Sequence, residues 1–458
     1  MHDLRDGRQL SGGIVQHTDY SHLRRVLGLA FGIAVVVGGT IGQGILRSPG
    51  LVAQGVPDAT FMLILWVAGG LIALIDAMST VELAASIPVA GGPYAFTKRA
   101  FGQMTGLAVG LTDWLGNLAG IAYVSVVFAE YVHRLGFLTG ISLGMIAAAL
   151  PIVMAAIQWF GTRVAGKSQE IGSALKALIL LGLIVALLVS PRGEPVVAPS
   201  HLSPTFTFVG AIAAIRAIYG TYYGWNGAVY FSEEVRDPGH SIARATFSGI
   251  LVVTGIYTLI VLSCLHVLTI PEMAASNLVV ADAAARVFGS AADTVVTIVS
   301  LISLAAVANV IVMMIPRVLL AIARDADDFP GLSHVAENGT PRVALVVTVA
   351  LSSLLATIGA YDILLTLSVS LLAAMSLCIN LAAITMRLRE PELARPYRMP
   401  LFPLPAVFAM IVNAGLLWAF VYEDPTTSLL AFMLLAAIVV PIYALIRYRA
   451  RRRVATAG

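Results

Sequence analysis

Long apolar runs, each followed by a short polar stretch, succeed one another along almost the whole chain. An α-helix needs about 20 mostly apolar residues to cross the hydrocarbon core of a bilayer. The pattern therefore predicts an all-α polytopic membrane protein with twelve transmembrane helices. The predicted spans are 26–53, 60–87, 104–133, 138–160, 169–190, 207–235, 243–268, 290–321, 343–358, 362–386, 401–422 and 427–448.

The composition agrees with lipid as the main solvent. Of the 458 residues, 59% are hydrophobic and only 12% are charged, whereas soluble domains carry about 25% charged residues. A sizeable soluble module is thereby excluded. The first apolar run is too long for a signal peptide, so no cleavable leader is predicted. Cys264 and Cys378 lie in separate apolar runs, which favours packing roles over a disulfide.

Basic residues predict how the spans are oriented. Lys and Arg gather in cytoplasmic loops and tails, and all but six of the 28 fall on the side of the two termini. Both termini are therefore expected in the cytoplasm, with the protein in the cell inner membrane. The basic run 447–453 directly follows the last span, which favours contact with anionic lipid over nucleic-acid binding. The six exceptions are Arg47, Arg134, Lys176, Arg192, Arg216 and Arg286.

Two predicted spans contain glycine clusters that a regular helix does not tolerate well. Residues 38–44 read GGTIGQG and residues 220–227 read GTYYGWNG, and each glycine costs a helix about 1 kcal/mol relative to alanine. Close helix packing is one explanation for such glycines. However, the clusters fall in spans 1 and 6, which correspond if the fold is two inverted repeats of five helices. Interrupted helices at corresponding positions indicate the binding site of a transporter.

Several motifs, spread in order over most of the chain, resemble those of the amino acid–polyamine–organocation (APC) transporters. The resemblance covers residues 39 to 400, and its strength lies in the combination, because each motif alone is short. The motifs are GTIGQGI at 39–45, EL at 82–83, IPVAGGPY at 87–94, RAFG at 99–102, YYGWN at 222–226, EEV at 233–235, DP at 237–238, ARD at 323–325, FPG at 329–331, TP at 340–341 and RPYRMP at 395–400.

The resemblance implies a LeuT-type fold, which is a 5+5 inverted repeat with discontinuous helices 1 and 6 plus two peripheral helices. The implied divisions are a tail at 1–25, repeats at 26–190 and 207–386, two helices at 401–448 and a basic tail at 449–458. The resemblance also implies that backbone of Ile41, Gly42, Gln43 and Gly44 holds a substrate carboxylate. Carbonyl groups from Tyr219 to Gly224 would hold the ammonium, and side chains near Tyr222, Tyr223, Gly224, Trp225 and Asn226 would shape the pocket.

Lys176 is a charged residue within the fifth span. A charge at mid-depth is costly, so its ammonium is expected to face the bundle interior and to mark an ion or proton pathway. It resembles a family lysine that takes the place of Na⁺ and supports the broken first helix. Whether Lys176 carries a proton during transport or is a purely structural cation is left open by the sequence.

The chain departs from the family pattern at the outer end of span 6. The family usually has a large side chain before the Tyr-x-Gly-Trp stretch, and Gly220 stands there instead. Arg216 precedes it by one turn, and Arg47 lies just beyond the first break. We interpret both arginines as possible vestibule charges that favour anionic or strongly polar substrates. The alternatives are an internal pair of Arg216 with Asp76 or Glu130, or snorkelling to the interface.

The sequence thus predicts a sodium-independent secondary transporter of amino acids or related amines, working by alternating access as an exchanger or proton symporter. Alternatives are a receptor on the same scaffold, disfavoured by the short tails, and a sodium-coupled transporter, disfavoured by Lys176. The run GTRVAGKS at 161–168 fits the Walker A pattern, but a membrane helix precedes it where a phosphate-binding loop needs a strand. No catalytic or metal motif is recognised, so the chain is not expected to be an enzyme or to bind a cofactor. The loop between spans 3 and 4 has no cysteine. A monomer or non-covalent homodimer is therefore expected, and no disulfide-linked partner.

Overall fold

The computed structural model describes residues 23, 25–42, 44–191, 208–276, 278–289, 291–326 and 330–457. Within them the chain is helical, and the one β interaction is a parallel bridge between Leu27 and Val235. The helices are α1 (Leu29–Thr40), α2 (Gly44–Gly55), α3 (Ala59–Ser86), α4 (Pro93–Phe101), α5 (Gln103–Arg134), α6 (Leu143–Trp159), α7 (Thr162–Val189), α8 (Phe208–Tyr222), the 3₁₀ helix η2 (Trp225–Phe231), α9 (Pro238–Val267), α10 (Ile270–Ala275), α11 (Val279–Phe288), α12 (Ala291–Met314), α13 (Pro316–Ala326), α14 (Pro330–Ser333), α15 (Arg342–Thr357), α16 (Tyr361–Arg389), α17 (Leu404–Glu423) and α18 (Pro425–Ala457).

The chain is a multi-pass membrane protein, but the predicted count of twelve full-length spans is met only in part. Eight helices of the described chain are long and apolar enough to cross a membrane, or up to nine when α1 and α2 are taken as one span bent by 47°. The helices α6 and α15 are apolar but shorter. At about 1.5 Å per residue, the 17 residues of α6 fall short of a hydrocarbon core of about 30 Å.

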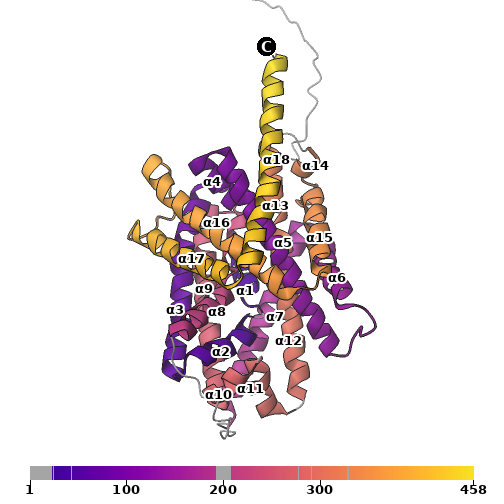
Figure 1. Cartoon of the computed structure of the whole chain (residues 1–458), viewed down its shortest axis with the longest axis vertical. Helices are drawn as coiled ribbons and strands as arrows, with labels where there is room; N and C mark the ends of the chain where they lie inside the picture. Colours follow the sequence, from indigo (N-terminus) through magenta and orange to yellow (C-terminus); the bar gives the residue numbers. More distant parts are fainter. Residues whose placement is uncertain are drawn as a thin grey trace, which may run out of the picture.

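The helices form two packed groups. In the first, which we call the bundle, α3 and α1 pack on α9 and α2 packs on α8, and these helices share one large apolar core. In the second, which we call the scaffold, α5 packs on α16, and α6 packs on α15 and α12. The two groups meet where α1 of the bundle contacts α12 of the scaffold. The helix α7 packs on both α1 and α12 at this boundary (Figure 1).

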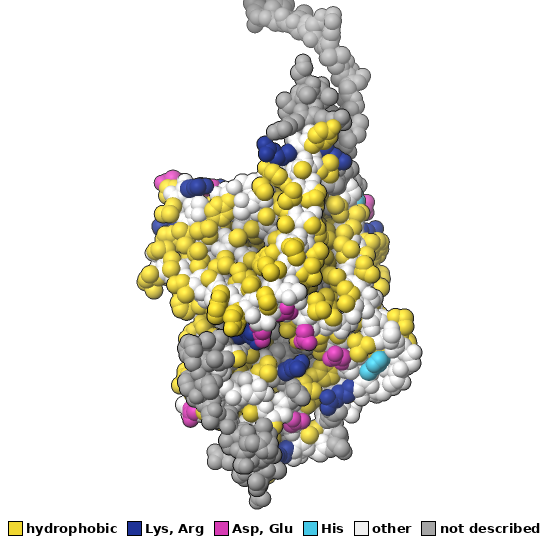
Figure 2. Space-filling view, viewed as in Figure 1, with side chains coloured by type: hydrophobic (Ala, Val, Ile, Leu, Met, Phe, Trp, Pro, Cys, Tyr) yellow, Lys and Arg dark blue, Asp and Glu magenta, His cyan; other side chains and the backbone are white. Residues whose placement is uncertain are grey.

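The last two helices lie outside both groups. The helix α17 packs on α16 and α3, and α18 packs on α16 and α5 (Figure 1). Large apolar side chains on the outside of the molecule are widely exposed, for example Leu178 at 67% and Ile411 at 67%. Figure 2 shows such side chains over the upper part of one face, with charged groups above them and across the lower part of that face. A surface of this kind fits a surrounding of lipid chains.

Several connections predicted as loops contain short helices. After α3 the chain turns through Gly91 and Gly92, whose φ angles are +93° and +42°, and Pro93 then begins α4. A side chain at Gly91 would meet Ala321 at 2.4 Å, so the motif at 87–94 brings α4 against α13. The pattern of apolar runs does not predict these helices, because each is too short or too polar to span a bilayer.

Candidate functional site

The two glycine clusters produce two helix breaks that lie against each other. The helix α1 ends at Thr40 and α2 begins at Gly44, while α8 ends at Tyr222 and η2 begins at Trp225. Gly224, between α8 and η2, has a φ of +121°, and a Cβ built on it would lie 2.5 Å from the carbonyl oxygen of Gly39. Only glycine fits there, because both the conformation and the close backbone contact exclude a side chain.

A tyrosine of α9 joins the two breaks. The hydroxyl of Tyr257 lies 2.8 Å from the carbonyl oxygen of Thr40 and 3.1 Å from that of Thr221. The side chain is fully buried and packs edge-on against Trp66 and Tyr222. Carbonyl groups freed by a break inside a membrane need a donor, and the one hydroxyl proton of Tyr257 is shared between the carbonyl groups of the two helix ends. The sequence prediction missed this residue, although a tyrosine within an apolar run is itself a sign of a buried partner.

We expect Tyr257→Phe to destabilise the protein and to slow transport together. The substitution leaves the two carbonyl groups without their donor, at a cost of about 1–3 kcal/mol. The midpoint of thermal unfolding in detergent and initial rates of uptake into liposomes measure the two effects. Tyr422→Phe is the matched control, because Tyr422 is 77% exposed on α17. Equal melting midpoints for the two variants would show that the bridge has no importance for stability.

The helices α2 and α8, one from each broken helix, are also tied together. Thr221 donates its hydroxyl proton to the carbonyl of Ala217, and the Ser48 hydroxyl lies 2.7 Å from the Thr221 hydroxyl. Since the Thr221 proton is already used, Ser48 donates in this contact. A Cβ on Gly44 would lie 2.9 Å from Thr221. The N-terminus of α2 is therefore held next to the C-terminal turn of α8.

Lys176 of α7 lies directly behind the first break. Its Nζ donates to the carbonyl oxygens of Gly38 at 2.9 Å and Ile41 at 2.5 Å, and the side chain is completely buried. No carboxylate of the described chain forms an ion pair or hydrogen bond with it. One and two turns earlier on the same face, Ser173 donates to the carbonyl of Ala34 and Gln169 donates to Ser173. The structure thus adds Gln169 and Ser173 to Lys176 as supports of α1, through a row with helical spacing.

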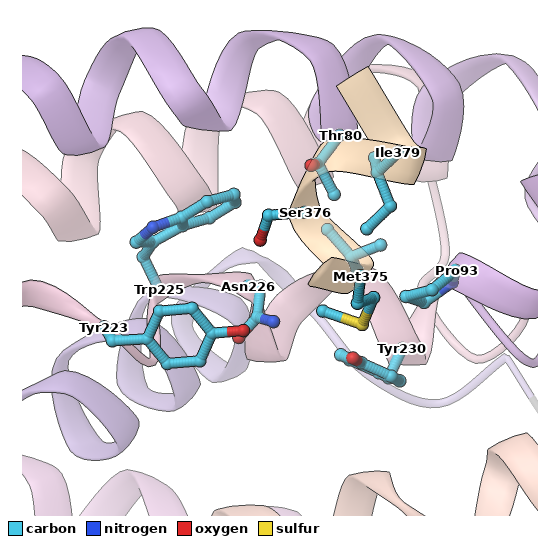
Figure 3. Close-up of a pocket in the computed structure, with 10 residues that line it drawn as sticks. Thr80, Pro93, Tyr223, Trp225, Asn226, Tyr230, Met375, Ser376 and Ile379 are labelled. Atoms are coloured by element: carbon cyan, nitrogen blue, oxygen red, sulfur yellow. The ribbon is translucent and has the colours of Figure 1, made fainter. Parts of the chain in front are cut away.

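A small cavity lies beside the second break (Figure 3). Its volume is about 10 Å³, which is room for about one water molecule, and the predicted residues Tyr223, Trp225 and Asn226 all line it. The Tyr223 hydroxyl is buried at the cavity, where the side chain of Ser376 interacts with it. The remaining lining residues are Thr80, Pro93, Val229, Tyr230, Met375, Ser376 and Ile379.

Other predicted residues lie apart from this cavity. Tyr222 points the opposite way, and its hydroxyl donates to the carbonyl of Trp66. Tyr219 bonds to Asp76 and Asn413 instead. Ile41, Gly42 and Gly44 are at the first break and do not line the cavity, and Gln43 lies outside the described residues. Gly220 faces open space, because nothing lies within 4 Å of a Cβ built there.

The two arginines expected at the outer vestibule have different surroundings. Arg216 forms a two-pronged ion pair with Glu423 at the end of α17 and lies over the ring of Phe420. Its carboxylate partner is therefore neither Asp76 nor Glu130, and it lies 207 residues away along the chain, where no sequence pattern links the two. Arg47 is exposed on α2.

Ion pairs join the bundle to the scaffold beyond η2. Glu234 and Arg317 pair at 2.9 Å while 0% and 3% exposed, and Arg317 also stacks on Phe231. Glu233 pairs with Arg324 and accepts hydrogen bonds from the backbone N–H groups of Leu23 and Ala90. In the same way Glu82 binds two arginines of the α16–α17 region, Arg387 and Arg395. The acidic motifs at 82–83 and 233–235 therefore link α3 and the segment after η2 to α13 and α16 through ion pairs.

Comparison with known proteins agrees with this architecture. The family model described as amino acid permease matches residues 27–445. This chain belongs to the amino acid permease family. The match confirms the resemblance to the APC superfamily. Together with the relatives named below, it also confirms the prediction that the chain is a transporter and not an enzyme.

Three relatives illustrate the range of the family. The serine/threonine exchanger SteT of Bacillus subtilis is 27% identical over 406 residues, covering 86% of this chain and 90% of the relative. The b(0,+)-type amino acid transporter 1 of Mus musculus is 27% identical over 420 residues, covering 88% and 84%. The large neutral amino acids transporter small subunit 2 of Homo sapiens is 28% identical over 400 residues, covering 83% and 74%. All three names describe amino-acid transport.

Proposed function

We propose that this permease moves an amino acid or a closely related amine across the cell inner membrane by alternating access. In this proposal twelve spans form a LeuT-type 5+5 repeat, with α1–α2 and α8–η2 as the discontinuous helices 1 and 6. The repeats occupy 26–190 and 207–386, and α17 and α18 are the peripheral pair. Both termini lie in the cytoplasm. The bundle would rock against the scaffold around the breaks.

The contact between the two helix breaks is the observation that carries the proposal. At this contact the N-terminus of α2 presents unpaired N–H groups, which favour a carboxylate. The C-terminal turn of α8 presents carbonyl oxygens, which favour an ammonium group. An amino acid has both groups on one carbon atom. A pair of opposite helix ends, held together by the Ser48–Thr221 contact, therefore matches the substrate class.

Residue roles extend this picture. Backbone N–H groups of Gly42, Gln43 and Gly44 would bind the carboxylate beside Ile41, whose own N–H donates to the carbonyl of Val37. Carbonyl groups between Tyr219 and Gly224 would bind the ammonium. The cavity wall formed by Tyr223, Trp225 and Asn226 would receive the side chain of the substrate. Tyr222 would act indirectly, because its hydroxyl holds α3 through the carbonyl of Trp66.

We propose sodium-independent transport, since the ammonium group of Lys176 fills the space behind the first break. Two cations would repel each other there. Exchange is the leading mode, because the name of SteT describes an exchanger. Proton symport is the second mode, favoured by a buried ammonium group that only carbonyl oxygens hold. We further propose a monomer or non-covalent homodimer without a disulfide-linked partner.

Arg216 and Arg47 are proposed to bias the outer vestibule toward anionic or strongly polar amino acids. We expect Arg216→Met to shift the preference in competition assays toward neutral substrates by about fivefold, the loss of a part-screened charge interaction of about 1 kcal/mol. Glu423→Gln is the matched control, because it removes the partner of Arg216 but keeps the guanidinium. An unchanged preference in Arg216→Met would remove Arg216 from substrate selection.

A binding screen tests the substrate class. The purified protein is melted with each of the common amino acids and with several amines at millimolar concentration. A ligand raises the free energy of unfolding by RT ln(1 + [L]/Kd), which is about 4 kcal/mol when the concentration is a thousand times Kd. We expect a small set of amino acids to raise the melting midpoint. Absence of any shift across the set would contradict the proposed substrate class.

A further inference from the structure

A second buried polar cluster lies on the other side of the second break, away from Lys176. Its centre is Asp76 in the middle of α3, which is 2% exposed. Four helices contribute to it: Asp76 from α3, Tyr219 from α8, Asn380 from α16 and Asn413 from α17. The cluster adjoins the cavity, because Thr80 lies one turn after Asp76 and Ser376 lies one turn before Asn380, and both line the cavity (Figure 3).

The amide groups of this cluster can be oriented without ambiguity. The Asn413 nitrogen lies 2.8 Å from the carbonyl of Ala409 and 3.2 Å from Oδ1 of Asp76. The Asn380 nitrogen likewise lies 2.9 Å from the carbonyl of Ser376 and 3.1 Å from the same Oδ1. Each nitrogen has two protons and faces two acceptors. Oδ1 of Asp76 therefore accepts two hydrogen bonds, and the amide oxygen of Asn413 points toward Tyr219.

If Asp76 is ionised, there are too few protons for the hydrogen bonds among its Oδ2 atom, the Tyr219 hydroxyl and the amide oxygen of Asn413. The Tyr219 hydroxyl lies 2.8 Å from the amide oxygen of Asn413 and 3.1 Å from Oδ2 of Asp76. A hydroxyl has one proton, so it can satisfy only one of these two oxygens. With an ionised Asp76, one oxygen–oxygen contact would lack a proton. With a protonated Asp76, Oδ2 donates to Tyr219, and Tyr219 donates to Asn413.

The surroundings also disfavour a charge on Asp76. No Lys, Arg or His of the described chain pairs with it, and its interacting groups are the two amides and Tyr219. Tyr223, also on α8, is a further titratable group within electrostatic range. The helices α9 and η2 also pack on α3, and no charged side chain from their described residues interacts with Asp76. An isolated carboxylate at membrane depth costs several kcal/mol.

We propose that Asp76 is a proton-binding site, and that its bound proton fastens the bundle helices α3 and α8 to α16 and α17. In the described conformation the proton closes the chain Asp76–Tyr219–Asn413. Its release to water requires that these helices separate, because the ionised group has no cation here and would take the Tyr219 proton away from the amide oxygen of Asn413. Tyr219 lies one turn before the second break, so separation of the cluster alters the backbone proposed to hold the substrate ammonium.

The link to transport rests on the proposed function, whereas the bound proton does not. Infrared spectra of the purified protein at neutral pH test the proton directly, through the C=O stretch of a protonated carboxyl group. We expect a band that shifts in D₂O, is lost in Asp76→Asn and moves to higher frequency in Tyr219→Phe. Asp113→Asn, at a buried carboxyl in contact with Tyr230 and Asn117 instead, should leave this band in place.

Separate measurements test the proton bound at Asp76 and its coupling to transport. Identical spectra of wild type and Asp76→Asn in this region would overturn the proton site. If Asp76→Asn does not fold, an unmoved band in Tyr219→Phe has the same meaning. In liposomes, we expect uptake by Asp76→Asn to lose the pH dependence of the wild type, whereas Lys167→Met should retain it. Retained pH dependence in Asp76→Asn would overturn the coupling, and absence of all amino-acid uptake would instead count against the proposed function.

Discussion

Replacing Lys176 with methionine is expected to reduce amino-acid uptake by at least about tenfold. The Nζ atom of Lys176 holds the carbonyl oxygens of Gly38 and Ile41. A hydrogen bond from a charged donor contributes about 1.5–3 kcal/mol, and about 1.4 kcal/mol corresponds to a factor of ten in a population. Without the ammonium group, the first break loses its support from α7. Initial rates of radiolabelled uptake into liposomes measure the effect.

Lys167→Met on the same helix is the matched control for Lys176→Met. Lys167 is exposed and forms a surface ion pair with Glu170, and such pairs contribute about 0–1 kcal/mol. We therefore expect its uptake to equal that of the wild type. Lys176→Arg keeps the charge but not the shape of the ammonium group, so it should also fail. Wild-type rates in Lys176→Met would show that the support of the break is unimportant.

Arg317→Met is expected to give the largest loss of stability among single substitutions of charged residues in this protein. It leaves Glu234 buried and without its cation, although the pair joins the segment after η2 to α13. Breaking a buried ion pair by removing one partner costs about 3–5 kcal/mol. The double variant Glu234→Gln with Arg317→Met removes both charges and should recover a large part of this loss. Melting midpoints in detergent measure both effects.

The exposed pair of Lys98 with Asp325 provides the control for Arg317→Met. These side chains are 35% and 37% exposed, so Lys98→Met should change the free energy of unfolding by less than about 1 kcal/mol. A double variant as unstable as Arg317→Met alone would contradict the explanation by an unpaired buried charge. It would then point to lost packing of Arg317 on Phe231.

Features that depend on local sequence could be predicted. The apolar runs predicted the positions of the helices, because the length of a membrane helix is set by the thickness of the bilayer. The glycines at 38–44 and 220–227 predicted the two breaks, since glycine disfavours a helix wherever it occurs. The charge of Lys176 within an apolar run predicted a buried interior group, and the structure places it on the carbonyls of the first break.

Features that depend on tertiary contacts could not be predicted in this way. Tyr257 bonds to Thr40, which lies 217 residues away, and Asp76 bonds to Asn413, which lies 337 residues away. Polar residues in apolar spans signalled that partners exist, but not which ones. The pairing of Arg216 with Glu423 was missed for the same reason.

Uptake by the purified protein in liposomes tests the central claim that the two broken helices form an amino-acid transport site. Liposomes with and without internal amino acid are supplied with the radiolabelled amino acid that raises the melting midpoint most, and Gly224→Ala is measured alongside. The account predicts saturable uptake by the wild type, strongest in liposomes loaded with amino acid, and none by a folded Gly224→Ala. Absence of saturable uptake by the wild type, or wild-type rates in Gly224→Ala, would contradict it, whereas equal uptake by empty liposomes would exclude only exchange.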